Sequence, residues 1–239
     1  MTALHALSPD EVAARLSASP ESRAALVREA AEAGYPDAQA ALGQMLLDGH
    51  GVAKDGRAAL GWFTRAAAQH HLMALNMVGR CYDLGWGTQP DKARAAQCYR
   101  IAAERGMPEA MYNYATLLAL GHGVAEDKAT ALAWLEKAAA LGFAKAANFV
   151  GSFAEDGWAG PRDMAKAADC YAQAARGGDF RGCFNHARML ADAGHGDGAL
   201  HWIGEAARLG HDRFRGQMRD WLAGAPEPLR SRGLAVLPC

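Results

Sequence analysis

The chain repeats itself every 36 residues, and this period constrains the fold more than any single segment does. Equivalent positions are Ala38, Ala74, Ala110, Ala146 and Gly182. Within each copy two helix-like stretches flank a glycine-rich turn, most clearly in residues 110–145. Self-similarity at a fixed period is the sequence signature of a solenoid, in which each repeat stacks on its neighbours. The sequence therefore predicts an all-α fold, a solenoid of stacked helix pairs.

The repeats divide the chain into a repeat array with a cap at each end. An end repeat has solvent where a neighbour would pack, so solenoids need such caps. The fifth copy is short, because Ala174-Ala175 recurs as Ala206-Ala207 after 32 residues rather than 36. The expected segments are 1–37 (N-terminal capping helix pair), 38–73, 74–109, 110–145 and 146–181 (full repeats), 182–211 (shortened repeat) and 212–239 (capping helix and irregular tail).

Small and polar residues recur where helices should begin, end or approach each other. The first helix of a repeat (helix A) should end at a glycine and the second (helix B) should begin after an N-capping aspartate. The glycines are Gly49, Gly85, Gly121 and Gly157, and the aspartates are Asp55, Asp91, Asp127 and Asp163. Helix A carries a small residue for close helix packing, at Gly43, Gly79, Ala115 and Gly151. Helix B should pack through Trp62, Cys98, Trp134 and Cys170. His70 replaces the glycine that closes helix B in later repeats.

Composition argues against several function classes. Lys and Arg number 25 against 26 Asp and Glu, a balance that offers no general attraction to nucleic acid. No apolar run approaches the roughly 20 residues of a membrane-spanning helix, so no membrane insertion is expected. The first residues, MTALHALSPDEV, do not read as a secretory signal, and a cytoplasmic location is expected. The chain has five cysteines and no CxxC pair, and in a reducing compartment they should mostly be small core side chains: Cys81, Cys98, Cys170, Cys183 and Cys239.

The repeat pattern resembles the Sel-one-like repeat family, a relative of the tetratricopeptide repeats, over residues 20–211. Residues 110–145 supply the match through Ala110, Tyr114, Ala115, Leu118, Gly121, Gly123, Val124, Asp127, Ala131, Trp134, Ala138, Ala139 and Gly142. The resemblance implies a right-handed superhelix of antiparallel helix pairs and a role as an adaptor or scaffold, often in bacterial signalling, envelope or host-interaction systems. A cysteine-rich branch of the family is associated with penicillin binding and weak β-lactamase activity. Its disulfide pattern is missing here, since only Cys81 and Cys98 could pair within a full repeat.

No catalytic motif is present in the sequence. The chain has no S-x-x-K, G-x-S-x-G, H-E-x-x-H or Walker A motif, so no catalytic residue and no cofactor is predicted. Cys183 and His186 lie three apart, but a zinc site needs about four ligands. A hydrogen-bonded core histidine is the expected alternative at His186, and no metal site is predicted.

The expected binding surface is a stripe of helix A positions. In the tetratricopeptide relatives helix A lines the concave face, and three positions per repeat map to it. This helix A stripe consists of Ala40, Gln44, Leu47, Asn76, Arg80, Asp83, Tyr112, Thr116, Ala119, Asn148, Ser152, Glu155, Phe184, Arg188 and Ala191, with Asn113 beside it. Its polar and aromatic members could bind a peptide: Asn76, Arg80, Asp83, Tyr112, Thr116, Asn148, Ser152, Glu155, Phe184 and Arg188. The alternative is a merely solvated face.

One turn position offers further contacts. It holds His50 and His122 in alternate repeats, with Trp86 and Trp158 between them. Exposed tryptophans can anchor a partner, and loop variability is the alternative. The expected function is a non-enzymatic, monomeric scaffold that binds a protein or peptide. The alternatives are a hydrolase of β-lactam or cell-wall substrates, from the family branch alone, and an accessory regulatory subunit of an enzyme or uptake system.

Overall fold

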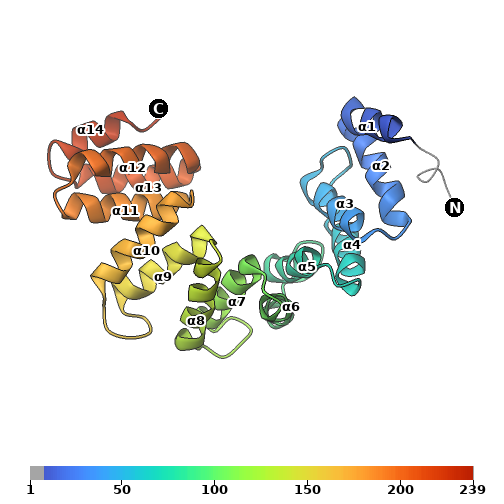
Figure 1. Ribbon diagram of the computed structural model, residues 1–239, viewed down its shortest axis with the longest axis horizontal. Helices are drawn as coiled ribbons and strands as arrows, with labels where there is room; N and C mark the ends of the chain where they lie inside the picture. Colours follow the sequence, from blue (N-terminus) through green and yellow to red (C-terminus); the bar gives the residue numbers. More distant parts are fainter. Residues whose placement is uncertain (1–7, 239) are drawn as a thin grey trace. The chain divides into compact units, whose positions relative to one another are not determined.

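A computed structural model describes residues 8–238, which contain fourteen α-helices and no β-strand (Figure 1). The all-α prediction is confirmed. In chain order the helices are α1 (Pro9–Ala18), α2 (Pro20–Glu32), α3 (Pro36–Asp48), α4 (Gly56–Ala68), α5 (Leu72–Leu84), α6 (Lys92–Glu104), α7 (Pro108–Leu120), α8 (Lys128–Ala140), α9 (Ala144–Asp156), α10 (Met164–Arg176), α11 (Phe180–Asp192), α12 (Gly196–Leu209), α13 (Asp212–Ala223) and α14 (Leu229–Ala235). Helix A of the five repeats is α3, α5, α7, α9 and α11, and helix B is α4, α6, α8, α10 and α12.

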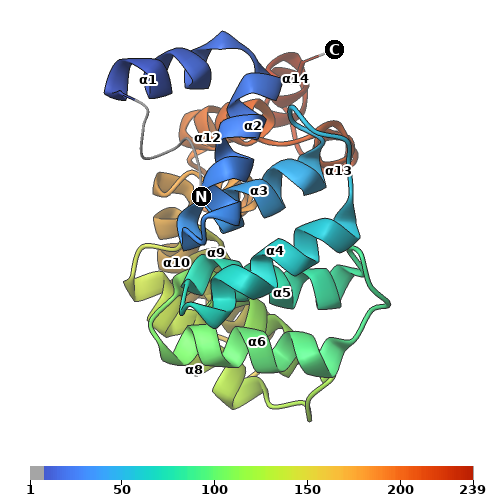
Figure 2. The ribbon, with the colours of Figure 1, turned by 90° about the vertical axis from the view of Figure 1, so that its right-hand side faces the viewer.

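The helices fall into two compact units, Met1–Glu126 with α1 to α7 and Asp127–Cys239 with α8 to α14. In the first unit every helix packs on the next one along the chain, and Figure 2 shows α3 to α6 following one another in this way. In the second unit α8 to α12 pack in the same sequential manner. Each unit is therefore a stack of helix pairs, as a solenoid requires.

The ends of the helices follow the predicted signals. Gly49, Gly85, Gly121 and Gly157 all cap helix A in the left-handed conformation, with φ between 65° and 75°. The four aspartates before helix B each accept a hydrogen bond of 2.9 Å from a backbone N–H in the first turn. His70 has φ 67° and is the one non-glycine residue with positive φ among residues 8–238. Local backbone chemistry thus fixes the repeat boundaries.

The packing within a helix pair differs from the prediction at one position. Cys98 and Cys170 are only half-buried, whereas Tyr99 and Tyr171, one residue later, are 1% exposed. Each tyrosine ring lies over the helix A glycine of its own repeat: a β-carbon on Gly79 or Gly151 would lie 2.6 Å from ring atom Cε1. Gly79 and Gly151 thus each lie under an aromatic ring, and the helix B packing face is centred one residue later than predicted.

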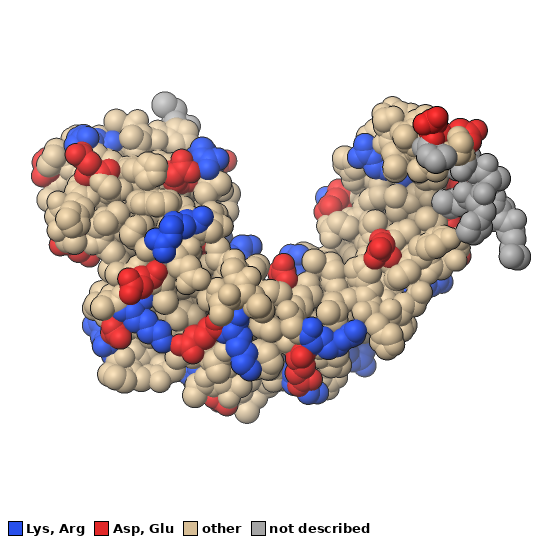
Figure 3. Space-filling model, in the orientation of Figure 1, with Lys and Arg blue, Asp and Glu red and all other residues tan. Residues whose placement is uncertain are grey.

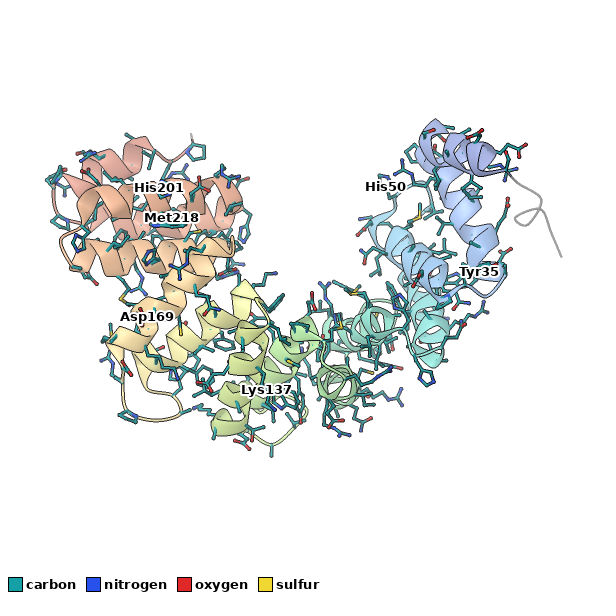
Figure 4. All side chains as sticks on the ribbon, viewed as in Figure 1. Tyr35, His50, Lys137, Asp169, His201 and Met218 are labelled. Atoms are coloured by element: carbon teal, nitrogen blue, oxygen red, sulfur yellow. The ribbon has the colours of Figure 1, made fainter. Side chains whose placement is uncertain are left out.

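The tryptophans at the same helix B position are half-buried as well. Arg65 stacks over Trp62, and Lys137, labelled in Figure 4, stacks over Trp134, each cation 4.5 Å from the ring centroid. Each ring is thus covered on one face by a charged side chain of its own helix, and Trp62 also packs at the edge of the core.

The C-terminal segment is more ordered than an irregular tail. Leu229–Ala235 form α14, which packs on α12 and α13. Met218 of α13, labelled in Figure 4, is fully buried in this cluster together with Leu222, and Leu229 is 8% exposed. Burial of these apolar side chains stabilises α14, a helix that local helix propensity alone does not predict. Cys239 lies outside the described residues. Across residues 8–238, no helix has both the length and the apolar character needed to span a membrane.

Candidate functional site

The asparagines of the helix A stripe join neighbouring repeats. The Asn76 side-chain carbonyl on α5 accepts a hydrogen bond of 3.0 Å from the Asn113 amide on α7. The Asn148 carbonyl on α9 accepts a corresponding bond of 2.8 Å from the Asn185 amide on α11. Asn76 is 4% exposed and Asn148 is half-buried. These amides therefore hold adjacent helices together, and little of Asn76 is left for a partner.

Glu155 is the centre of a polar network in the second unit. The Tyr171 hydroxyl donates to its carboxylate at 2.6 Å, and the Arg188 guanidinium forms an ion pair with it at 3.0 Å. Burial raises the pKa of the Glu155 carboxyl, but the hydrogen bonds from Tyr171 and Arg188 outweigh burial and leave that pKa below its usual value. Arg188 also donates to Asn185, so it is fully engaged within the protein.

Asp83 lies at the equivalent position two repeats earlier and has a similar setting. Lys92 forms an ion pair with the Asp83 carboxylate and also donates to its backbone carbonyl at 2.9 Å. The Tyr99 hydroxyl lies 3.4 Å from the same carboxylate. Burial raises the pKa of the Tyr99 hydroxyl, and the Asp83 charge adds to that effect. Both acidic residues of the stripe are thus paired with cations of their own unit.

A pocket of about 570 Å³ lies between the first two repeats. It brings together Gln44 and Leu47 of α3, Arg80 of α5, and Trp86 of the following turn. The Arg80 guanidinium stacks on the Trp86 ring, 4.7 Å from its centroid. Arg80 belongs to the predicted helix A stripe and Trp86 to a separate predicted turn position, and the structure joins them in one site, the Arg80–Trp86 pocket.

Lys54 and Asp48 complete the charged lining of the Arg80–Trp86 pocket. The Lys54 stem packs over the turn at Gly49, where a β-carbon would lie 2.7 Å from Lys54 Cγ. Asp48 accepts a hydrogen bond of 2.9 Å from Gln44. Neither Lys54 nor Arg80 forms an ion pair with any of residues 8–238, and together with the hydrogen-bonded Asp48 carboxylate they give the pocket lining an excess of positive charge.

The other stripe residues lie apart from this pocket. Thr116 bonds the Tyr112 carbonyl of its own helix at 2.9 Å, and Ser152 bonds the Asn148 carbonyl at 3.4 Å. Phe184 packs edge-on against Phe214 and Trp221. Tyr112 is half-buried on α7.

The remaining turn residues differ from Trp86. Trp158 is 42% exposed and packs edge-on against Phe149 and Phe153, with ring centroids 6.0 and 5.2 Å away. His50, labelled in Figure 4, and His122 are exposed at their turns. Trp158 therefore belongs to an aromatic cluster of its own repeat.

The expectation of a hydrogen-bonded histidine at position 186 is wrong. The Nδ1 atom of His186 is buried without a hydrogen-bond partner among residues 8–238, and the ring packs against Trp202. Burial, helped by the Arg176 charge, lowers the pKa of this imidazole. In the part of the chain that the structure describes, no group of three or more His, Cys, Asp or Glu side chains could hold a metal ion.

The four described cysteines are free thiols. Cys81 and Cys183 are buried, and burial raises the pKa of each thiol to about 11. Cys98 and Cys170 are half-buried rather than buried, which corrects the prediction for these two. High thiol pKa values make thiolate chemistry at neutral pH unfavourable for Cys81 and Cys183.

The sequence did not identify several residues of these networks as candidates, among them Lys54, Asn185 and Tyr171. A second period of 72 residues could have identified the last two. It relates Asn76 to Asn148, Asn113 to Asn185, Asp83 to Glu155, and Tyr99 to Tyr171. No comparable signal marks Lys54. In both units lysine and arginine are interspersed with acidic residues on the face shown in Figure 3, so charge clustering does not mark the site either.

The stacked helix pairs and their periodic caps define a helical-repeat protein of the tetratricopeptide-like class. A model of the Sel1 repeat matches residues 36–71, 72–107, 108–143, 144–179 and 197–211. The chain therefore belongs to the Sel1 repeat family, whose members typically mediate protein–protein interaction.

Known relatives are similar over different shares of their length. Chitin synthase regulatory factor 3 of Schizosaccharomyces pombe is 34% identical over 134 residues, 55% of this chain and 14% of that protein. The structure of a Sel1 repeat protein from Oxalobacter formigenes is similar with a TM-score of 0.74 and 26% identity, over 85% of this chain and 87% of that one. The protective antigen c5321 of uropathogenic Escherichia coli has the same fold, with a TM-score of 0.71 and 23% identity over 95% of this chain and 51% of that one.

Proposed function

We propose that this chain is a non-enzymatic interaction module that binds a protein partner on its helix A face, with the Arg80–Trp86 pocket as the centre. The observation that carries the proposal is the convergence of three stripe residues, Gln44, Leu47 and Arg80, with Trp86 around one cavity. Arginine and tryptophan are the side chains most often found as energetic anchors of protein interfaces. Stacking on Trp86 also orients the Arg80 fork before a partner arrives.

The proposal places less weight on the rest of the helix A stripe. Asn76, Asp83, Glu155 and Arg188 are already bonded within the protein, so a partner would have to break these contacts to use them. Asn148 is likewise bonded to Asn185. Tyr112 and Thr116 are further contact positions in the first unit, and Ser152, Phe184 and Trp158 are separate contact positions in the second unit. A partner centred on the Arg80–Trp86 pocket leaves these internal bonds of the protein intact.

A second candidate function is that of an accessory regulatory subunit. The observation that favours it is the similarity to chitin synthase regulatory factor 3, a protein named for a regulatory role. The partner would then be an enzyme, bound through the same face. The two candidates differ in what is bound and share the binding surface.

Photo-crosslinking from a chosen position tests the shared surface. A photoreactive amino acid replaces Gln44, which is exposed beside the pocket, or Gln97, which is exposed on helix B of the second repeat. Irradiation of the native host cells that produce these variants should give crosslinked protein adducts from position 44 and few from position 97. Equal adducts from both positions, or none from 44, would contradict the proposal. A single stoichiometric enzyme among the adducts would favour the accessory subunit.

A further inference from the structure

The 36-residue period allows the surroundings of Arg80 to be compared with those of the later repeats. The pocket is built from two positions of one repeat, Leu47 and Lys54, and from Arg80 of the next repeat. The equivalent sets are Asp83, Pro90 and Thr116; Ala119, Glu126 and Ser152; and Glu155, Arg162 and Arg188. Only the first and last sets have a cation at both of the last two positions.

In the last set, a carboxylate of the protein itself pairs with the cation at the third position. Glu155 stands where Leu47 stands in the first set, and its carboxylate forms an ion pair with Arg188 at 3.0 Å. Arg162 donates to the Glu155 backbone carbonyl at 2.6 Å, and its positive charge contributes to lowering the pKa of the Glu155 carboxyl. The cation at the third position therefore holds a carboxylate directly, and the cation at the second position adds positive charge nearby.

The first set has the cations without the internal carboxylate. At position 47 the side chain is an uncharged leucine, and the Arg80 guanidinium lies against Met77 sulfur and the Trp86 ring without an ion pair among residues 8–238. A stacked guanidinium keeps its in-plane N–H donors free, and these are suited to a carboxylate. The adjacent cavity of about 570 Å³ supplies the room.

We infer that the Arg80–Trp86 pocket binds an acidic segment of the partner protein, with a partner carboxylate on Arg80 in the way that the Glu155 carboxylate lies on Arg188, and with Lys54 adding positive charge at the same pocket. This inference rests on the proposed function and adds the chemistry of the partner. Leu46, Leu47 and Trp86 supply apolar lining, so an apolar side chain beside the acidic one completes the fit. Asp48 is bonded to Gln44 and leaves an excess of positive charge at the pocket.

Synthetic peptides test the chemistry directly. The probe is a fluorescein-labelled peptide of repeating Glu-Leu-Gly units, and its control has glutamine in place of glutamate. Fluorescence anisotropy with the full chain should show binding of the acidic probe at least about tenfold tighter than of the control, since a charge-assisted hydrogen bond contributes about that factor. Arg80→Gln and Lys54→Gln should each weaken binding. Arg65→Gln, which removes an arginine stacked on Trp62 outside the pocket, should leave it unchanged.

The sharpest variant is Leu47→Glu, which places an internal carboxylate where Glu155 has one. It should abolish binding of the acidic probe, while the uncharged Leu47→Gln retains it; thermal unfolding confirms that both proteins fold. Equal affinity for the two probes overturns the inference but leaves the proposed function standing, provided that crosslinks form at position 44. No binding of either probe, unaltered binding by Leu47→Glu, or displacement by free succinate as effective as by unlabelled peptide also overturns it.

Discussion

The ring of Tyr171 covers Gly151 so closely that a β-carbon at position 151 would lie 2.6 Å from Cε1 of the ring. Gly79 has the same relation to Tyr99, and Gly43 has a similar one to Phe63, at 2.7 Å. These three aromatic side chains are each 1% exposed. A helix A glycine and a helix B aromatic ring thus form the recurring contact that closes a helix pair.

Replacing this glycine should destabilise the protein although alanine is the better helix former. Gly151→Ala should lower the free energy of unfolding by about 1–3 kcal/mol, because the rigid Tyr171 ring must move. The matched control is Gly204→Ala on α12, where no atom lies within 4 Å of the added carbon. That change should raise stability by up to about 1 kcal/mol. Denaturant unfolding measures both, and equal effects would contradict the packing account.

The turn at His70 should be improvable. A non-glycine residue in the left-handed region costs about 1–2 kcal/mol, and the greater freedom of unfolded glycine offsets part of the gain on substitution. His70→Gly should therefore stabilise the chain by up to about 1 kcal/mol. Gly106→Ala is the converse control, since Gly106 has φ 91° and no neighbour within 4 Å of an added carbon. Gly106→Ala should lower the free energy of unfolding. Thermal or urea unfolding of the two variants measures both effects, and a loss of stability in His70→Gly would contradict the expectation.

His186 should make stability depend on pH. Its pKa is lowered in the folded state, so between the folded pKa and the unfolded value of about 6.5 the unfolded chain binds more protons. The free energy of unfolding should have its full value above about pH 6.5 and should fall as the pH drops below it. His186→Leu, which restores the apolar residue type of Leu42 and Val150, should add about 1–3 kcal/mol because a buried unpaired nitrogen is removed.

The measurement is the unfolding midpoint in urea from mildly alkaline to mildly acidic pH. The gap between His186→Leu and wild type should widen as the pH falls. His201→Gln serves as the control because His201 is exposed on α12. Parallel curves for wild type and His186→Leu would show that the buried imidazole does not govern this pH dependence.

The bond between Tyr171 and Glu155 should contribute to stability at neutral pH. Tyr171→Phe should cost about 1–3 kcal/mol, since the hydroxyl donates to a charged carboxylate at 2.6 Å. The folded pKa of Glu155 is lowered, so its contribution is present above the unfolded carboxyl value of about 4.3 and is lost as the pH falls through the folded pKa. Tyr99→Phe is the control, with a smaller cost expected at its 3.4 Å separation from Asp83. Acid titration of unfolding free energies compares the two, and a steeper acid loss in Tyr171→Phe than in wild type would refute the account.

Local signals in the sequence determined the repeat architecture. The left-handed glycines and the capping aspartates act on their own backbone within a few residues, so their positions predict the helix ends directly. The period then implies that each helix pair meets a similar neighbour. By contrast, α14 lacks such a local pattern and owes its place to apolar packing on α12 and α13.

Only the tertiary structure decided which side chains remain available to a partner. The sequence predicts Asn76 and Glu155 as binding residues. In the structure each is bonded to a residue of the next repeat, Asn113 and Arg188, which lie 37 and 33 positions further along the chain. Conversely, Arg80 and Trp86 meet with Lys54 around one pocket, although no helical period links the three. Such pairings depend on distances and rotamers across repeats, and these are fixed when helices stack rather than by the local chain.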